Sequence, residues 1–197
     1  RLLSEFEPRA EQIPLQERYA TILEAMLASV STPIEADDVL LGRVVEGPLP
    51  TGTAWRPNLP GFASCGHVTP DYPTLLGTGL RRLAQEAELT AQRLGDPESH
   101  WFANSASRCC AAIVAYAERY ARAAERAAGT ADGPRREHLE RAAKALRTVP
   151  GEPAPDFVSA LQGIWIVHLV LSAYVGARDF AFGRMDQYLL PLYQRGL

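Results

Sequence analysis

The sequence predicts a mainly α-helical protein with one or a few short strands. Apolar residues recur at helical spacing in several stretches, one β-branched run lies between turn residues, and Pro or Gly separates these stretches. A chain of 197 residues is long enough to bury about 70% of its unfolded surface around one core. Because no internal repeat or low-complexity tract divides it, residues 1–197 are expected to form a single unit.

The first expected elements are a helix, a strand and a long loop. Leu15 to Ser29 has apolar residues at helical spacing, which predicts an amphipathic helix. Residues 39–45, VLLGRVV, are β-branched and lie between turn residues, which is typical of a short buried strand. Residues 47–73 are rich in Pro and Gly but keep several apolar side chains, so we expect an ordered loop of the kind that lines a site.

Four further helices are expected. Thr74 to Leu94 forms the first and is ended by Asp96-Pro97, and Trp101 to Ala128 forms an Ala-rich second with one apolar stripe. Arg135 to Arg147 is short and highly charged, which is typical of a surface helix. Phe157 to Val175 is apolar nearly throughout and is therefore expected to be buried.

Composition excludes several classes of function. A net charge of -3 with 22% charged residues gives no reason to expect nucleic acid or an anionic membrane as a partner. Polar residues such as Gln162 and His168 interrupt the apolar run, which makes it a poor membrane span. Three cysteines, two of them adjacent, cannot form a disulfide framework, so we expect a cytoplasmic protein. The start at Arg1 rather than Met suggests a piece of a longer polypeptide.

His67 is the best single candidate for a functional side chain. It lies between Gly66 and Pro70-Asp71, so its backbone is held while its imidazole can donate or accept. A structural histidine bonded to a nearby carbonyl is the competing interpretation. Asp71 has a simpler explanation, because it precedes an expected helix and is suited to cap it.

The other candidates favour structural roles. Cys109-Cys110 lies inside an Ala-rich helix with no neighbouring base, which favours small core residues over a reactive pair. Cys65 lies two residues before His67, a weak signal for catalysis. His168 lies on an apolar helix, where a satisfied core histidine is the usual case, and no spacing of His, Cys and carboxylates indicates a metal site.

A cluster of charges follows the apolar helix. Arg178 and Arg184 could each clamp a carboxylate or another oxyanion, because the guanidinium fork matches two oxygens. For Arg184 and Asp186 we expect instead an internal ion pair that holds the turn. Arg178 and Asp179 remain open as binding residues.

Three blocks of sequence resemble the glycyl radical enzyme family, which includes pyruvate formate-lyase and the diol, choline and hydroxyproline lyases and dehydratases. The blocks are residues 66–72 (GHVTPDY), residues 149–169 (VPGEPAPDFVSALQGIWIVHL) and residues 182–193 (FGRMDQYLLPLY). Residues 38–42 are also similar to a strand of that family. The blocks span most of the chain in the family's order, so the resemblance is more specific than any single motif.

The resemblance implies a fold and a set of partners. The chain would be the N-terminal part of a ten-stranded α/β barrel, in which a glycyl radical near the C-terminus passes to a cysteine that attacks the substrate. Neither residue is present here, so this segment would bind no cofactor directly and would be inactive alone. The partners implied are the rest of its own chain, a radical S-adenosylmethionine activating enzyme, a small-molecule substrate and a second copy in a homodimer.

The resemblance also implies roles at the site. His67 matches a histidine that lies against the substrate in dehydratase members, and Arg178-Asp179 fall where many members carry a His-Ser pair. Arg in place of His supplies a permanent cation, so Arg178 either grips an anionic substrate group or is neutralised by Asp179. We therefore expect a substrate-pocket-forming part of a lyase or dehydratase for a small polar or anionic molecule; the alternative is a degenerate, non-enzymatic helical scaffold.

Overall fold

The computed structural model describes residues 12–45, 67–174 and 180–196. These residues form α-helices, one short π-helix and no strand. The elements are α2 (Leu15–Ser29), α3 (Tyr72–Thr78), α4 (Leu80–Arg93), α5 (Pro97–Ala128), α6 (Gly133–Thr148), α7 (Phe157–Leu169), η2 (Val170–Tyr174), α8 (Met185–Tyr188) and α9 (Leu190–Arg195).

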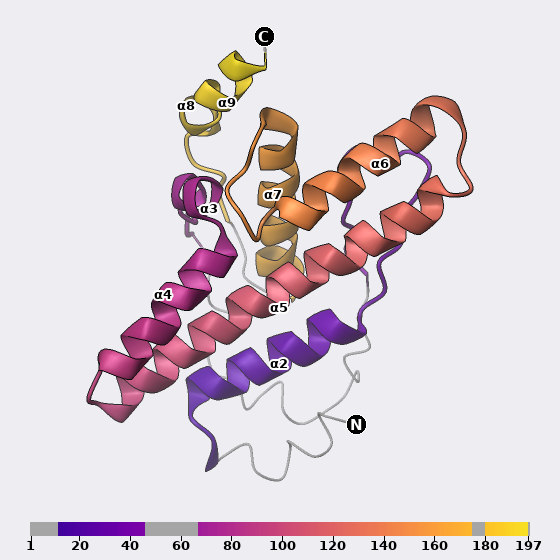
Figure 1. The fold of residues 1–197 in the computed structure, drawn as a ribbon. Helices are drawn as coiled ribbons and strands as arrows, with labels where there is room; N and C mark the ends of the chain where they lie inside the picture. The colour runs from indigo at the N-terminus through magenta and orange to yellow at the C-terminus, as the bar shows by residue number, and fades with distance from the viewer. Residues whose placement is uncertain (1–11, 46–66, 175–179, 197) are drawn as a thin grey trace.

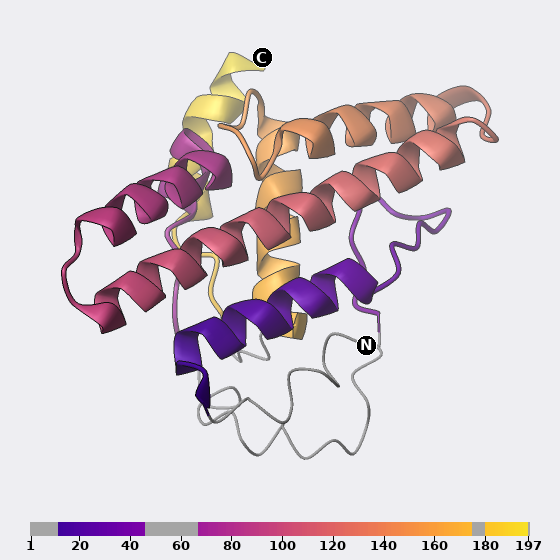
Figure 2. The same cartoon turned by 60° about the horizontal axis from the view of Figure 1, so that its bottom comes forward.

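Helix α5 is the long axis against which α2, α4 and α6 pack. It contacts α2, α4 and α6 along its length, and α4 and α6 run opposite to it (Figure 1). Helix α7 crosses behind this layer, as the turned view confirms (Figure 2). Its side chains Ile164 and Ile166 are buried in the same core as Tyr116 and Tyr120 of α5. The apolar stripe predicted for α5 therefore packs in one core with the apolar helix α7.

The start of α5 differs from the expectation. The helix begins at Pro97 rather than Trp101, because Asp96 caps it and accepts a hydrogen bond from the Ser99 amide at 2.8 Å. Pro97 suits the first helical position, where no intrahelical amide bond is needed. Asp96-Pro97 thus follows the end of α4, as expected, and also begins α5.

The single helix expected from Thr74 to Leu94 is wrong. It is divided into α3 and α4 at Gly79, whose φ of +80° leaves the helical region. The turn after α6 occupies the break: the Leu80 amide donates to the Pro150 carbonyl at 2.8 Å, and the Arg81 amide donates to the Gly151 carbonyl at 3.0 Å. Tertiary hydrogen bonds therefore replace the helical ones at this point.

The strand predicted at residues 39–45 is also wrong for the structure described. The segment pairs with side chains of α7 instead of another strand: the Leu41 amide donates to Oε1 of Gln162, and Nε2 of Gln162 donates to the Leu41 carbonyl, both at 2.8 Å. Nε1 of Trp165 donates to the Gly42 carbonyl at 2.8 Å. The expected burial holds for Leu41 but not for the β-branched Val39 and Val44, which are 77% and 68% exposed. The primary amide of Gln162 supplies the hydrogen bonds that a neighbouring strand would supply.

Arg119 of α5 closes the C-terminal end of α2. Its guanidinium donates to the carbonyls of Leu27 and Val30, two of the groups that a helix end leaves without helical partners. Arg119→Leu should lower the free energy of unfolding by about 1–3 kcal/mol because these carbonyls lose charge-assisted bonds. Urea unfolding checks this against Arg122→Leu, whose ion pair with Glu118 is long at 3.9 Å. Equal losses in the two variants would contradict the role given to Arg119.

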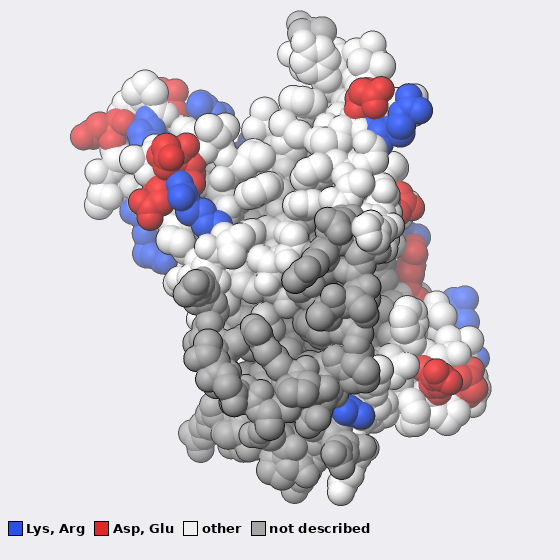
Figure 3. All heavy atoms as spheres, turned by 180° about the vertical axis from the view of Figure 1, so that it is seen from behind, with Lys and Arg blue, Asp and Glu red and all other residues white. Residues whose placement is uncertain are grey.

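The apolar run of α7 and η2 is placed in the interior. Phe157–Tyr174 is long and apolar enough to cross a membrane by composition, and 56% of this stretch is buried inside the protein. The core helix of a soluble protein can be equally long and apolar. The polar residues that interrupt the run fit this interpretation better than a membrane span. Seen from behind, the described charged side chains gather at the margins of the face, and uncharged side chains cover much of the described remainder (Figure 3).

Candidate functional site

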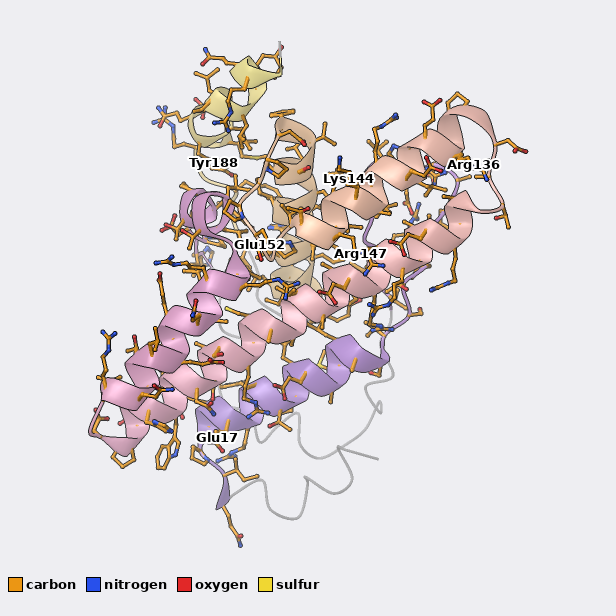
Figure 4. The ribbon with its side chains drawn as sticks, viewed as in Figure 1. Glu17, Arg136, Lys144, Arg147, Glu152 and Tyr188 are labelled. Atoms are coloured by element: carbon orange, nitrogen blue, oxygen red, sulfur yellow. The ribbon has the colours of Figure 1, made fainter. Side chains whose placement is uncertain are left out.

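The three sequence blocks meet around His168, near the C-terminal end of α7. Val68 of the first block accepts a hydrogen bond from the Ala181 amide at 3.1 Å, just before the third block. A side-chain carbon at Gly183 would lie 2.8 Å from Cγ2 of Thr69, so the two segments approach closely there, and the φ of +68° at Gly183 also favours glycine. Figure 4 shows the result, with Tyr188 of α8 beside α3.

Tyr72, His168 and Phe182, one from each block, form an aromatic stack. The hydroxyl of Tyr72 lies 3.1 Å from Nδ1 of His168. The ring of Phe182 stacks on that of His168 at 4.2 Å between centroids and on Tyr72 at 6.0 Å. Tyr188 closes the arrangement by donating from its hydroxyl to the Phe182 carbonyl at 2.7 Å. The blocks are thus joined by directed contacts as well as by burial.

Burial sets the protonation states in this stack. It raises the pKa of Tyr72 to about 12, with a smaller contribution from Tyr188, and it lowers the pKa of His168. At neutral pH the tyrosine therefore keeps its proton and the imidazole is neutral. This combination allows the Tyr72 hydroxyl to donate to Nδ1 of His168.

An open hollow lies beside the stack. Its lining comes from the first block, the adjoining Pro73 and the third block: Thr69, Pro70, Asp71, Pro73, Phe182, Gly183, Arg184, Gln187 and Tyr188. Polar groups and aromatic rings together line it, which suits a small polar partner or another segment of protein.

Asp71 acts as the helix cap that the sequence suggested. Its carboxylate accepts from the Thr74 amide at 3.1 Å and from the Thr74 hydroxyl at 2.7 Å. The hydroxyl bond and then the amide bond lower the pKa of this carboxyl. The proposed contact between Asp71 and a substrate stays a prediction.

Arg184 and Asp186 form an exposed ion pair. Their closest atoms are 3.7 Å apart, and the side chains are 72% and 73% exposed. An exposed pair of this length contributes little stability. The hydrogen bond from Tyr188 to the Phe182 carbonyl closes the same turn with better geometry, and the structural role expected of the ion pair stays a prediction.

His67 lies two residues before Thr69, the first residue that lines the hollow. It is exposed and has a φ of +58°, a left-handed conformation that is uncommon outside glycine. Arg178, Asp179 and Cys65 lie outside the described residues. Of the four residues predicted to bind substrate, the structure therefore places His67 and Asp71, on the same short segment.

The cysteines of α5 are poor candidates for chemistry. Burial raises the pKa of the Cys109 thiol to about 11, with a smaller contribution from Cys110, and burial also raises the pKa of Cys110. Both thiols therefore stay protonated at neutral pH. Among the residues described here, no group of His, Cys, Asp and Glu is arranged to hold a metal ion.

Sequence reasoning missed the partners of His168. This residue was expected to be a satisfied core histidine, and it is satisfied by Tyr72, 96 positions away in sequence. A usable signal was present: Tyr72, His168 and Phe182 all lie in the blocks that carry the family resemblance. Composition and spacing alone could not pair them, because nothing local links three separate segments.

The lowered pKa of His168 gives a test of this stack. An unfolded chain protonates histidine near about pH 6.5, whereas burial delays protonation in the folded state. Between these two pKa values the unfolded state binds more protons, so stability falls as the pH drops through about 6.5. His168→Gln removes this titration and should reduce the loss between about pH 7 and pH 5. Urea unfolding across this range measures it, and identical pH slopes would refute the assignment.

Comparison with known proteins defines the class of this protein. A glycyl radical enzyme from Archaeoglobus fulgidus superposes with a TM-score of 0.83 at 24% identity, covering 98% of this chain and 34% of its own. The helices thus adopt the fold of part of a glycyl radical enzyme, as the sequence predicted. The described residues contain no strand, so the ten-stranded barrel stays a prediction. Residues 51–197 match the family described as pyruvate formate lyase-like, and the chain belongs to that family.

Two curated relatives act on sulfonates according to their names. The isethionate sulfite-lyase of Bilophila wadsworthia is 35% identical over 137 residues, which cover 64% of this chain and 16% of that enzyme. The (2S)-3-sulfopropanediol dehydratase of Klebsiella oxytoca is 27% identical over 148 residues, covering 71% of this chain and 18% of that enzyme. The chain therefore spans less than a fifth of the length of these relatives.

Proposed function

We propose that this chain forms part of the substrate pocket of a glycyl radical lyase or dehydratase that acts on a small anionic molecule, with a sulfonate as the first choice. The hollow formed by the first and third family blocks carries the proposal: Asp71 lines it, His67 lies two residues before its lining residue Thr69, and it adjoins the stack that His168 of the second block joins. The sulfonate names of the two relatives support the charge of the substrate.

Each candidate residue has a part in this proposal. His67 would donate to or accept from a substrate oxygen, and Arg178 would bind the anionic group through two parallel hydrogen bonds, with Asp179 beside it. The radical glycine and cysteine would come from other parts of the protein, since Cys109 and Cys110 are half-buried on α5 and their thiols have raised pKa values. The radical S-adenosylmethionine activating enzyme, a homodimer and a cytoplasmic location belong to the same proposal.

The proposal is tested on the full-length protein, activated anaerobically by its activating enzyme. Isethionate and 2,3-dihydroxypropane-1-sulfonate are compared with uncharged glycerol, by sulfite release and by carbonyl formation. We expect turnover of a sulfonate and, for Arg178→Ala, a KM raised about 10- to 100-fold, because a charged hydrogen bond contributes about 1.5–3 kcal/mol. The KM of Arg178→Lys should lie between those of the wild type and Arg178→Ala.

Two results would count against the proposal. An unchanged KM in Arg178→Ala would remove the anion-binding role of this residue. A full-length protein with no radical signal and no turnover would favour the alternative of a helical scaffold without radical chemistry.

A further inference from the structure

His67 has a backbone conformation that its surroundings must maintain. A non-glycine residue with a φ of +58° is disfavoured by about 1–2 kcal/mol relative to the right-handed region, and such conformations persist where neighbouring contacts fix them. The next residue, Val68, supplies such a contact through the hydrogen bond from the Ala181 amide to its carbonyl at 3.1 Å.

Ala181 is in turn held by its neighbour Phe182. The carbonyl of Phe182 accepts from the Tyr188 hydroxyl, and its ring lies on the imidazole of His168 at 4.2 Å with an angle of 28° between the planes. This is the closest ring contact described in the stack. The position of Ala181 therefore depends on the orientation of the His168 ring.

His168 has its own support from Tyr72. The tyrosine is fully buried, with no exposed surface, and its hydroxyl lies 3.1 Å from Nδ1 of His168. The hydrogen bond to this buried tyrosine fixes the orientation of the His168 ring, which lies on the otherwise apolar helix α7. A continuous set of contacts thus runs from Tyr72 through His168, Phe182 and Ala181 to Val68, next to His67.

We propose that His168 is a positioning residue for His67: fixed by Tyr72 and stacked on Phe182, it sets the place of the segment from which His67 meets the substrate. The inference rests on the proposed function, since it gives His67 a substrate to contact. His168 itself need not touch that substrate, because its ring face and Nδ1 are both engaged by protein groups. Displacement of a binding group by about 1 Å can cost as much as 100-fold in rate.

Two substitutions separate the contacts of His168. His168→Phe keeps an aromatic ring against Phe182 and loses the bond to Tyr72, whereas His168→Ala loses both. His100→Ala is the matched control, because His100 also bonds through Nδ1, to the Ala91 carbonyl at 2.9 Å, but lies in the first turn of α5.

Hydrogen exchange in the full-length, unactivated protein gives the first test. The Ala181 amide should exchange about 10-fold faster in His168→Ala than in the wild type, and by a smaller factor in His168→Phe. The Ala154 amide, which donates to the Leu76 carbonyl at 2.9 Å, should keep its rate and serves as the internal reference. Unchanged exchange at Ala181, or equal acceleration at Ala154, would overturn the positioning role.

Calorimetric binding of isethionate to the same unactivated protein gives the second test. His168→Ala should weaken binding about 10-fold in the wild-type background and less than about 2-fold in a His67→Asn background, because both changes remove the same interaction. Asn is chosen because it tolerates the left-handed backbone. Equal losses in both backgrounds would overturn the inference. Failure of the wild type to bind any sulfonate would instead refute the proposed substrate class, while the exchange experiment still judges the role of His168.

Discussion

Gly79→Ala should be among the most destabilising single substitutions in this chain. A side-chain carbon there would lie 2.4 Å from the Gly151 carbonyl oxygen and 2.7 Å from the backbone of Glu152. Both neighbours are backbone atoms, so no side chain can rotate to make room. The residue also keeps a φ of +80°, which costs a residue with a side chain about 1–2 kcal/mol.

Relief of this clash would separate the α3–α4 junction from the turn after α6. The hydrogen bonds of Leu80 and Arg81 to that turn would then lengthen or break, at about 1 kcal/mol each. We expect a total loss of roughly 3–5 kcal/mol in the free energy of unfolding. For a chain of this size the melting temperature should fall by about 10 °C.

Gly77→Ala provides the matched control two residues away. Gly77 lies inside α3, and a side-chain carbon there would have nothing within 4 Å. Replacing a helical glycine by alanine should stabilise the protein by about 0.5–1 kcal/mol. Thermal unfolding should therefore show a lower melting temperature for Gly79→Ala and a higher one for Gly77→Ala. A shift of the same sign in both variants would show that the close approach at Gly79 does not constrain the fold.

Features of the fold that depend on neighbouring residues could be predicted from the sequence, and features that depend on distant residues could not. Helices were predictable from local signals, such as the apolar spacing of Leu15–Ser29 and the Asp71 cap before α3. The break at Gly79 was not, because glycine in a helical pattern is often tolerated, as Gly77 is inside α3, and the carbonyls that replace its helical bonds come from residues 150–151. Periodicity carries no information on such partners.

The site was predictable only through the family resemblance. Single residues such as His67 could be nominated from their loop context, but nothing in that context brings Val68 next to Ala181. The ordered blocks 66–72, 149–169 and 182–193 indicated which segments matter, and the structure explains why, since all of them meet at one end of α7. The blocks preserve contacts within the fold as well as groups that face a substrate.

Gln162 is the clearest example of such a contact, and Gln162→Leu is expected to be strongly destabilising. Its amide makes two hydrogen bonds of 2.8 Å to the backbone of Leu41, and Gln162 and Leu41 are 2% and 0% exposed. Leucine would fill the space but leave a buried amide and a buried carbonyl without partners. Because each such group costs about 1–3 kcal/mol, the free energy of unfolding should fall by roughly 2–6 kcal/mol.

Two variants of Gln162 and one control distinguish hydrogen bonding from packing. Gln85→Leu, on an exposed position of α4, should change stability by less than about 0.5 kcal/mol. Gln162→Glu should be destabilised at neutral pH, because a carboxylate can accept from the Leu41 amide but cannot donate to its carbonyl. Below the raised pKa of that buried carboxyl, its protonated form can do both, so part of the lost stability should return as the pH falls.

Urea unfolding at several pH values measures this difference between the two Gln162 variants. Gln162→Leu carries no titrating group and should show no such recovery relative to the wild type. A Gln162→Glu variant that instead lost stability in acid in parallel with Gln162→Leu would mean that packing, and not the paired hydrogen bonds, holds residues 39–45 against α7. Residues 39–45 would then owe their place to Leu41 and to the close approach of Gly42 to Trp165.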